Sequence, residues 1–307
     1  MSDTPDYPPA ETATPESLVA DLVDLLDVEE IDTDLYRGRR SRGGIGRVFG
    51  GQVIAQALQA AQRSTAMPRT AHSLHAYFMR PGDEQYPIIY RVVRDFEGRS
   101  FATRRVIAMQ RGQPILNMAA SFQIPEGGFH HQDRMPDVPG PESLESEAAI
   151  RARESRHFDE RIRRQLTRPR PIEMRPVHPR KWFEPTPGEP IQHSWFRVVA
   201  PIGDDAAMHR AMLSYASDMA LLGTCMLPHG VTWTTNGFQS ASLDHALWLH
   251  EECRVDDWLL FTTDSPWAGH ARGLNRGQFF TRDGRLVASV AQEGLIRQRA
   301  VAAGNEA

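Results

Sequence analysis

Apolar residues recur three or four positions apart in three segments of the chain, and this spacing predicts helices. The segments are 16–26, 47–64 and 206–222. The second contains Gly50-Gly51, where flexible glycines suit a turn of the chain, and continues with small apolar residues on one face. The third has an apolar face through Met212, Tyr215 and Met219. We therefore expect one short helix near the start and one long helix in each half.

Segments rich in β-branched and aromatic residues lie between these helices and predict strands. The first half predicts a strand in 31–40 and four more at 72–80, 87–96, 100–110 and 114–123. The joints of this group of four carry Pro-Gly-Asp, Glu-Gly-Arg and Arg-Gly-Gln, which favour turns. The second half predicts strands at 172–177, 194–199, 238–250, 257–265, 271–281 and 285–297.

The two halves share one order of elements: a strand, a long helix and then a meander of four antiparallel strands. A long helix wrapped by an antiparallel sheet is the hotdog fold, so the pattern predicts an α+β double hotdog. We expect a disordered tail at 1–14, one hotdog at 15–124, a connector at 125–168 and a second hotdog at 169–300. The connector region is marked by eleven of the 22 prolines, which fall within 125–190, and by a polar helical stretch at 145–165.

Composition and charge narrow the classes of function. The 307 residues carry 39 acidic and 35 basic side chains, a formal net charge of −4, so charge gives no reason to bind nucleic acid or an anionic membrane. The longest stretch without Asp, Glu, Lys or Arg, 219–243, is interrupted by Pro228 and three glycines, so it predicts no membrane span. The two cysteines form no metal-ligand or disulfide pattern, and the start of the chain lacks an apolar leader. We expect a cytoplasmic protein without a bound metal.

Three polar side chains could meet in the seam between the second long helix and its sheet. Asp218 has mostly apolar helical neighbours, so it either reaches solvent at an edge or needs buried hydrogen-bond partners. Strand alternation groups Ser242 with Asp244, and Gln292 with Val290; a lone Ser or Gln in a strand can also be a satisfied core group. Together, a carboxylate that accepts a proton and two groups that hold a water predict general-base hydrolysis.

Histidines are the competing bases. Asp244 and His245 are consecutive in a predicted strand, so we expect their side chains on opposite faces, where they cannot form a pair. Odd spacing likewise separates His72 from His75, so at most one of them reaches the seam; we keep His72 as a reserve base. The sequence has no serine nucleophile elbow, zinc-protease motif, phosphate-binding loop or dinucleotide motif.

The chain resembles the acyl-CoA thioesterase II family over roughly residues 16–298. The segments that carry the resemblance occur in family order: VFGGQVIAQAL, HSLHAYFMRPGD, SFATRRV, SYASDMALL, ASLDHALWLH and ASVAQEGLIR. The resemblance implies a double hotdog whose catalytic acid is Asp218, whose hydroxyl is Ser242 and whose glutamine is Gln292. The first half has no obvious equivalent of the acid, which implies one active site per chain.

The resemblance also implies an activity: hydrolysis of fatty acyl-CoA to a fatty acid and CoA, by water that Asp218 activates, without an acyl-enzyme and without a cofactor. Gly51 and Gln52 are candidate oxyanion donors at a helix start. We expect a homo-oligomer, because exposed sheet edges invite pairing. Two alternatives stay open: a hotdog enoyl-CoA hydratase or dehydratase, which usually needs an acid–histidine pair in one seam, and a non-catalytic acyl-CoA-binding protein.

Overall fold

The computed structural model describes residues 13–41, 44, 46–181 and 183–299, so nearly all of the predicted tail at 1–14 lies outside the described residues. The α-helices are α1 (Pro15–Leu26), α2 (Gly50–Arg63), α3 (Glu147–Glu154), α4 (Glu160–Thr167) and α5 (Ala206–Ser217), with short 3₁₀ helices at Pro141–Ser143, Ser155–His157 and Thr224–His229. The strands are β1 (Val28–Asp32), β2 (Leu35–Gly38), β3 (Thr70–Phe78), β4 (Ile88–Glu97), β5 (Phe101–Gln110), β6 (Gln113–Gln123), β7 (Ile172–Pro176), β8 (Ile191–Val198), β9 (Phe238–Ser242), β10 (Asp244–Leu249), β11 (Leu259–Gly269), β12 (Arg272–Thr281) and β13 (Leu286–Gln298).

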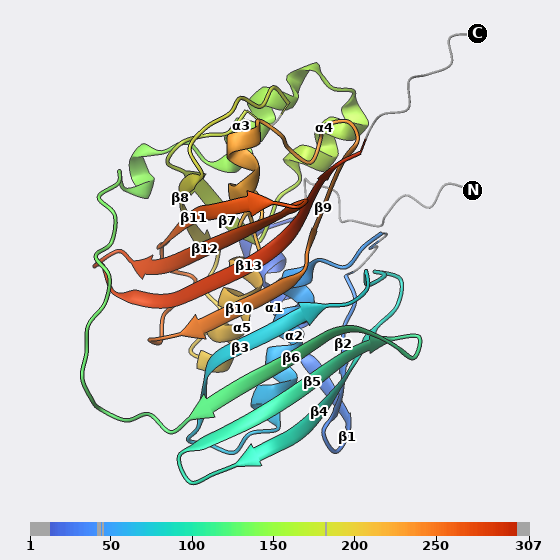
Figure 1. Cartoon of the computed structure of the whole chain (residues 1–307), viewed down its shortest axis with the longest axis vertical. Coiled ribbons are helices and arrows are strands. Elements are labelled where there is room, and N and C mark those ends of the chain that lie inside the picture. Colours follow the sequence, from blue (N-terminus) through green and yellow to red (C-terminus); the bar gives the residue numbers. More distant parts are fainter. Residues whose placement is uncertain (1–12, 42–43, 45, 182, 300–307) are drawn as a thin grey trace.

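The strands form one antiparallel sheet whose two halves mirror each other (Figure 1). Its order is β1-β2-β4-β5-β6-β3-β10-β13-β12-β11-β8-β7, with β9 also paired to β13. The run β2-β4-β5-β6-β3 repeats in reverse as β10-β13-β12-β11-β8, and the halves join where β3 pairs with β10. This arrangement confirms the predicted repeat and the α+β double hotdog. The predicted meander of four strands is wrong in one respect: β4-β5-β6 and β11-β12-β13 are meanders, but β3 pairs with β6 and β10 with β13 instead of with the next strand along the chain.

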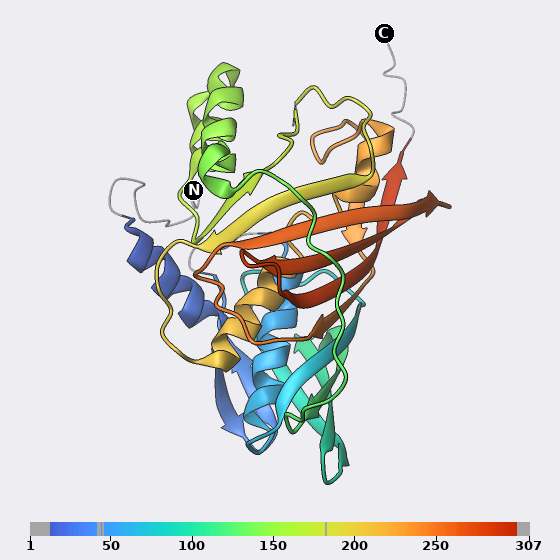
Figure 2. The same cartoon turned by 90° about the vertical axis from the view of Figure 1, so that its left-hand side faces the viewer.

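The long helices α2 and α5 pack against each other on one side of the sheet, as Figure 2 shows for the light-blue and gold helices. Every residue of α2 from Gly51 to Ala61 is buried, because small side chains let the sheet and α5 approach from several directions. A Cβ on Gly51 would crowd the Phe49 ring and the backbone oxygen of Tyr215 in α5. Glycine at this position therefore allows α2 and α5 to pack closely. The sequence suggested instead that it allows the chain to turn.

The connector covers the outer face of the second half. After β6 the chain runs along the outside of the sheet to α3 (Figure 1). Its apolar side chains pack on a small cluster that includes Trp195, Trp258 and Phe280. The predicted polar helix at 145–165 is broken into α3 and α4, because Asp159 caps a new helix through the N–H of Ile162. The boundaries 15–124, 125–168 and 169–300 stay predictions.

Two predicted strands are each split. The segment 31–40 was expected as one strand, but β1 and β2 form a hairpin around Asp34, whose φ of 57° lies in the left-handed region. The segment 238–250 is split into β9 and β10 at Leu243. In both places a residue at which the strand pairing breaks interrupts a run of residues that favour a single strand.

Candidate active site

The helices α2 and α5 run antiparallel, so the end of each lies beside the start of the other. Near the C-terminus of α2, Gln62 donates to the backbone oxygen of Ala207 at 3.3 Å. At the opposite end, a Cβ on Gly50 would lie 2.7 Å from Oδ2 of Asp218, which follows α5. We call the first region, from the α2 C-cap Ser64 to the start of α5, the Ser64 end. The second, from Asp218 to the first turn of α2, is the Asp218 end.

Asp218 is buried at the point where α5 stops. The sequence predicted a helix as far as residue 222, but α5 ends at Ser217 and Asp218 is its C-cap. The helix cannot continue because Ala220 has a φ of 61°, in the left-handed region. The Asp218 side chain is only 5% exposed, so the carboxylate does not reach solvent at a helix edge. A carboxylate in such a place requires polar partners.

Those partners form a linear hydrogen-bonded network. Gln292, fully buried on β13, donates from Nε2 to Oδ1 of Asp218 at 2.6 Å. The same nitrogen lies 3.1 Å from Nδ1 of His245, and Nε2 of His245 lies 2.9 Å from the hydroxyl of Ser217. Because Ser217 gives its own hydrogen to Ser214 O, His245 must donate from Nε2 and accept at Nδ1.

His245 is neutral in this network. It is fully buried, and burial lowers the pKa of its imidazole, although the Asp218 carboxylate opposes that shift. Nδ1 lies 3.9 Å from the nearer oxygen of Asp218, too far for a hydrogen bond. The contact between the two residues is therefore carried through Gln292, and they do not form an ion pair.

A β-bulge at Leu243 explains why strand alternation missed His245. Ser242 pairs with Gly294 and Ala246 pairs with Ala291, so four steps on one strand face three on the other. One extra residue reverses the alternation. His245 thereby turns toward the helices, on the face where Gln292 lies, while Asp244 accepts a hydrogen bond from the backbone N–H of Glu293 at 2.7 Å. The sequence offers no local signal for this bulge.

Ser242 lies on the same face of the sheet as Gln292. It pairs with Gly294, two residues beyond Gln292, and residues directly opposite in an antiparallel pair share a face. Within the described part of the chain its hydroxyl forms no hydrogen bond with Asp218 or Gln292. Of the three predicted residues, the structure thus links Asp218 and Gln292 directly and places Ser242 in an adjacent position.

The first turn of α2 presents backbone N–H groups beside Asp218. Its N-cap, Phe49, makes no side-chain capping bond. Among the described residues, neither Gly50 nor Gly51 has a hydrogen-bond partner for its N–H, whereas Gln52 donates its N–H to Phe49 O at 3.1 Å. Gly50 and Gly51 are therefore the available donors, and the predicted backbone donor Gln52 is already engaged. The macrodipole places partial positive charge at this position.

His72, the reserve base, lies at the other end of β3. Phe78 of the same strand approaches Gly50, and the six residue steps from His72 to Phe78 correspond to about 20 Å of strand. His72 contacts Ser121 Oγ at 2.9 Å and stacks edge-on with Phe101, and burial lowers its pKa. The structure does not bring His72 to the Asp218 end.

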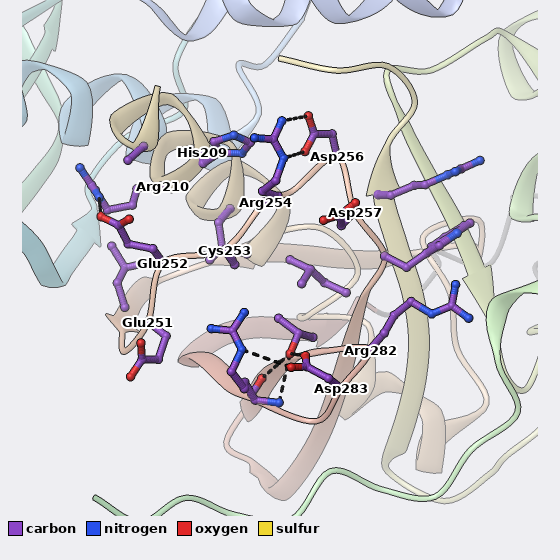
Figure 3. A pocket seen from close by; sticks show the side chains of 18 of the residues that line it. His209, Arg210, Glu251, Glu252, Cys253, Arg254, Asp256, Asp257, Arg282 and Asp283 are labelled. Carbon is purple, nitrogen blue, oxygen red and sulfur yellow. Dashed lines mark hydrogen bonds and ion pairs between the residues drawn. The ribbon is translucent and has the colours of Figure 1, made fainter. Parts of the chain in front are cut away.

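A hollow in the second half lies away from this network. About 710 Å³ in volume, it adjoins the N-terminal part of α5, at the Ser64 end of the helix pair (Figure 3). Each of its five arginines has a carboxylate partner, as for Arg254 with Asp256 at 2.9 Å; the others are Arg197, Arg210, Arg282 and Arg285. The hollow therefore offers an anionic ligand no arginine that is free of a carboxylate partner. Residues 13–41, 44, 46–181 and 183–299 contain no cluster of three metal-ligating side chains and no helix long and apolar enough to span a membrane.

The fold is that of a double-hotdog protein, and its described residues leave buried polar groups without partners at the Asp218 end of the helix pair. Residues 39–123 match the family model for the N-terminal domain of acyl-CoA thioesterases, and residues 166–295 match the acyl-CoA thioesterase model. The chain belongs to the acyl-CoA thioesterase family.

Individual relatives cover nearly the whole chain. Acyl-CoA thioesterase 2 of Haemophilus influenzae is 38% identical over 91% of this chain and 98% of its own length. Human acyl-coenzyme A thioesterase 8 is 40% identical, with 89% of this chain and 88% of its own covered. The solved structure of acyl-CoA thioesterase II TesB2 from Mycobacterium marinum has a TM-score of 0.75 at 40% identity, covering 90% of this chain and 98% of that one.

Proposed function

We propose that this protein hydrolyses acyl-CoA thioesters to a free fatty acid and CoA, with Asp218 as the general base. The observation that carries the assignment of the base is the position of its buried carboxylate, which accepts from Gln292 at 2.6 Å and lies against the first turn of α2. A base and a set of oxyanion donors are thereby close enough to act on one thioester carbonyl.

The reaction follows from these groups. Asp218 takes a proton from water as the water oxygen bonds to the thioester carbon, so no acyl-enzyme forms. The N–H groups of Gly50 and Gly51 stabilise the negative charge on the carbonyl oxygen. The carbon–sulfur bond then breaks, and the proton held by Asp218 passes to the thiolate of CoA. Ser242, on the neighbouring part of the sheet face, helps to hold the water or the substrate.

The hydratase alternative is less well supported by the site. That chemistry needs a histidine with a free nitrogen to move a proton on the enoyl substrate. Both nitrogens of His245 are engaged, one with Ser217 and one with Gln292, and the ring is fully buried. An aspartate and a histidine do lie near each other in the seam, but the histidine lacks a nitrogen that could exchange protons with substrate.

A thiol-release assay tests the function. Purified protein is incubated with acyl-CoA esters of increasing chain length, and CoA is followed with dithionitrobenzoate. We expect release with at least one chain length and no loss of enoyl absorbance from crotonyl-CoA in a parallel reaction. Saturable acyl-CoA binding without thiol release would support the binding-protein alternative instead.

A homo-oligomer, a cytoplasmic location and a role in fatty-acid metabolism complete the proposal. The sheet ends at β1 and β7, and exposed edge strands can pair with a second copy. Light scattering at micromolar concentration measures the mass: a single 34.5 kDa species would contradict the homo-oligomer without affecting the catalytic proposal.

A further inference from the structure

The amide of Gln292 has a defined orientation, and a histidine defines it. Its Nε2 has two hydrogens and two acceptors, Oδ1 of Asp218 at 2.6 Å and Nδ1 of His245 at 3.1 Å. Its Oε1 is buried and has no hydrogen-bond partner among the described residues. The network therefore uses both N–H donors of the Gln292 amide. The amide oxygen is left without a donor from the described protein.

We propose that His245 is a positioning residue, which holds the Gln292 amide so that Oε1 accepts a hydrogen bond from the attacking water. This inference rests on the proposed thioester hydrolysis. The water then donates one hydrogen to Asp218, which takes it as a proton, and the other to Gln292. Its lone pair is left to form the bond to the thioester carbon, and the electrons of the carbon–sulfur bond leave with CoA.

The opposite orientation of the amide would disable the site. With the amide reversed, Oε1 would face both the Asp218 carboxylate and the lone pair on Nδ1 of His245, which are two acceptors. The NH₂ group would then point to the water and compete for the lone pair that must attack. His245 prevents the reversal only while Nδ1 is unprotonated, a state that its full burial and the bond from Nε2 to Ser217 maintain.

Two substitutions of His245 by an uncharged amide, His245→Asn and His245→Gln, distinguish the positioning role from a role in packing alone. In His245→Asn, Oδ1 can occupy the place of Nδ1 and accept from Gln292. In His245→Gln, the longer side chain reaches the place of Nε2 and can contact Ser217, but leaves Gln292 without its acceptor. We expect kcat to fall no more than a few-fold in H245N and about 10- to 100-fold in H245Q, with KM little changed in both. Packing alone predicts the reverse ranking, because glutamine is closer in size to histidine.

A double-mutant cycle identifies the partner. Because His245 acts through Gln292, its substitution should lose its effect on kcat in a Gln292→Ala background. His209 offers a matched control: it is also buried and both its nitrogens are bonded, to Gly203 O at 3.0 Å and Val255 N at 3.2 Å, but it lies at the Ser64 end. His209→Gln should lower thermal stability and leave kcat within about two-fold in the fraction that folds.

The outcomes test the positioning role of His245 separately from the thioester hydrolysis on which it rests. If the wild-type protein releases no thiol from acyl-CoA, the hydrolysis itself is wrong. If the wild type is active but H245N and H245Q have equal kcat, or if H245Q and Gln292→Ala are additive, the positioning role is wrong and the hydrolysis stands. Circular dichroism of each variant shows that the comparison is made on folded protein. If H245Q does not fold, His245→Leu takes its place, because leucine keeps apolar bulk but offers Gln292 no acceptor; kcat equal to that of H245N would then overturn the positioning role.

Discussion

The two ends of the antiparallel helix pair occupy equivalent places in the two hotdogs, yet their polar groups are arranged differently. At the Ser64 end, α5 starts behind Asp205, whose carboxylate caps the N–H of Ala207, and α2 stops at Ser64, whose hydroxyl and carbonyl both accept from Arg104. At the Asp218 end, α2 starts on two glycines without a side-chain cap, and the C-cap of α5 is a carboxylate.

The two ends differ in how many of their buried hydrogen-bonding groups have a partner. Fully buried Arg104 bonds Ser64, two backbone oxygens and Glu97, so the polar groups of the Ser64 end satisfy one another. The Asp218 end leaves an acceptor on Gln292 and the N–H groups of Gly50 and Gly51 unpaired among the described residues. The two halves thus share the helix packing but differ at the helix ends: α2 has the C-cap Ser64, whose polar groups are hydrogen-bonded to Arg104, where α5 has the carboxylate of Asp218.

The largest effect on activity is expected from Asp218→Asn. Asparagine has nearly the same shape but cannot take the proton from water, so kcat should fall about 10²–10⁴-fold. Ser242→Ala and Gln292→Ala should cost less, because the base remains. Asp205→Asn is the matched control at the Ser64 end, since asparagine caps a helix as well as aspartate does. Near-normal kcat in D218N, measured by thiol release, would show that this carboxylate is structural.

Arg104→Met should have the largest effect on stability. It removes a buried guanidinium and leaves Ser64 O unpaired, while Glu97, whose side chain is 44% exposed, can recover water. We expect the free energy of unfolding to fall by about 2–3 kcal/mol, with kcat of the folded fraction preserved. Arg105→Met, which removes an exposed ion pair with Asp95, should lower the free energy of unfolding much less, because solvent screens that pair. Equal losses in the two variants, measured by urea unfolding, would contradict a special role for Arg104.

The difference between the ends was only partly predictable from sequence. Hydrophobic periodicity located the long helices and most strands because local spacing determines which face is buried. The resemblance selected Asp218, Ser242 and Gln292. Neither could show that a bulge at Leu243 turns His245 toward Gln292, since a one-residue slip depends on pairing with a distant strand. The end of α5 was misplaced for a related reason: Ala220 is a good helix former whose left-handed backbone is imposed by its surroundings.

A smaller effect is expected from Gly50→Ala, which tests how closely the helix start must approach the carboxylate. A Cβ there would lie 2.7 Å from Oδ2 of Asp218 and 2.9 Å from the ring of Phe78, so the carboxylate must move by a fraction of an ångström or more. We expect kcat to fall roughly 10- to 100-fold. Gly188→Ala, at a position with no neighbour within 4 Å of the new Cβ, is the control. If both variants are equally active, close contact at the Asp218 end is not required.

The smallest effect concerns the pH dependence of stability. Burial lowers the pKa of His245, so below the ordinary histidine value of about 6.5 the unfolded chain binds a proton that the folded chain does not. This contribution of His245 to the free energy of unfolding is complete above that pH and is lost as the pH falls.

Burial also lowers the pKa of His72, His193 and His250, but those contributions are common to wild type and variant. Between pH 7 and 5.5 the wild type should therefore lose about 1 kcal/mol more than His245→Asn, as measured by urea unfolding at the two pH values. Arg104→Met, which alters only the Ser64 end, should keep the wild-type slope. An identical pH dependence in wild type and H245N would mean that His245 is not held neutral in the folded protein, and the Asp218 end would then lack the acceptor at Nδ1 that orients Gln292.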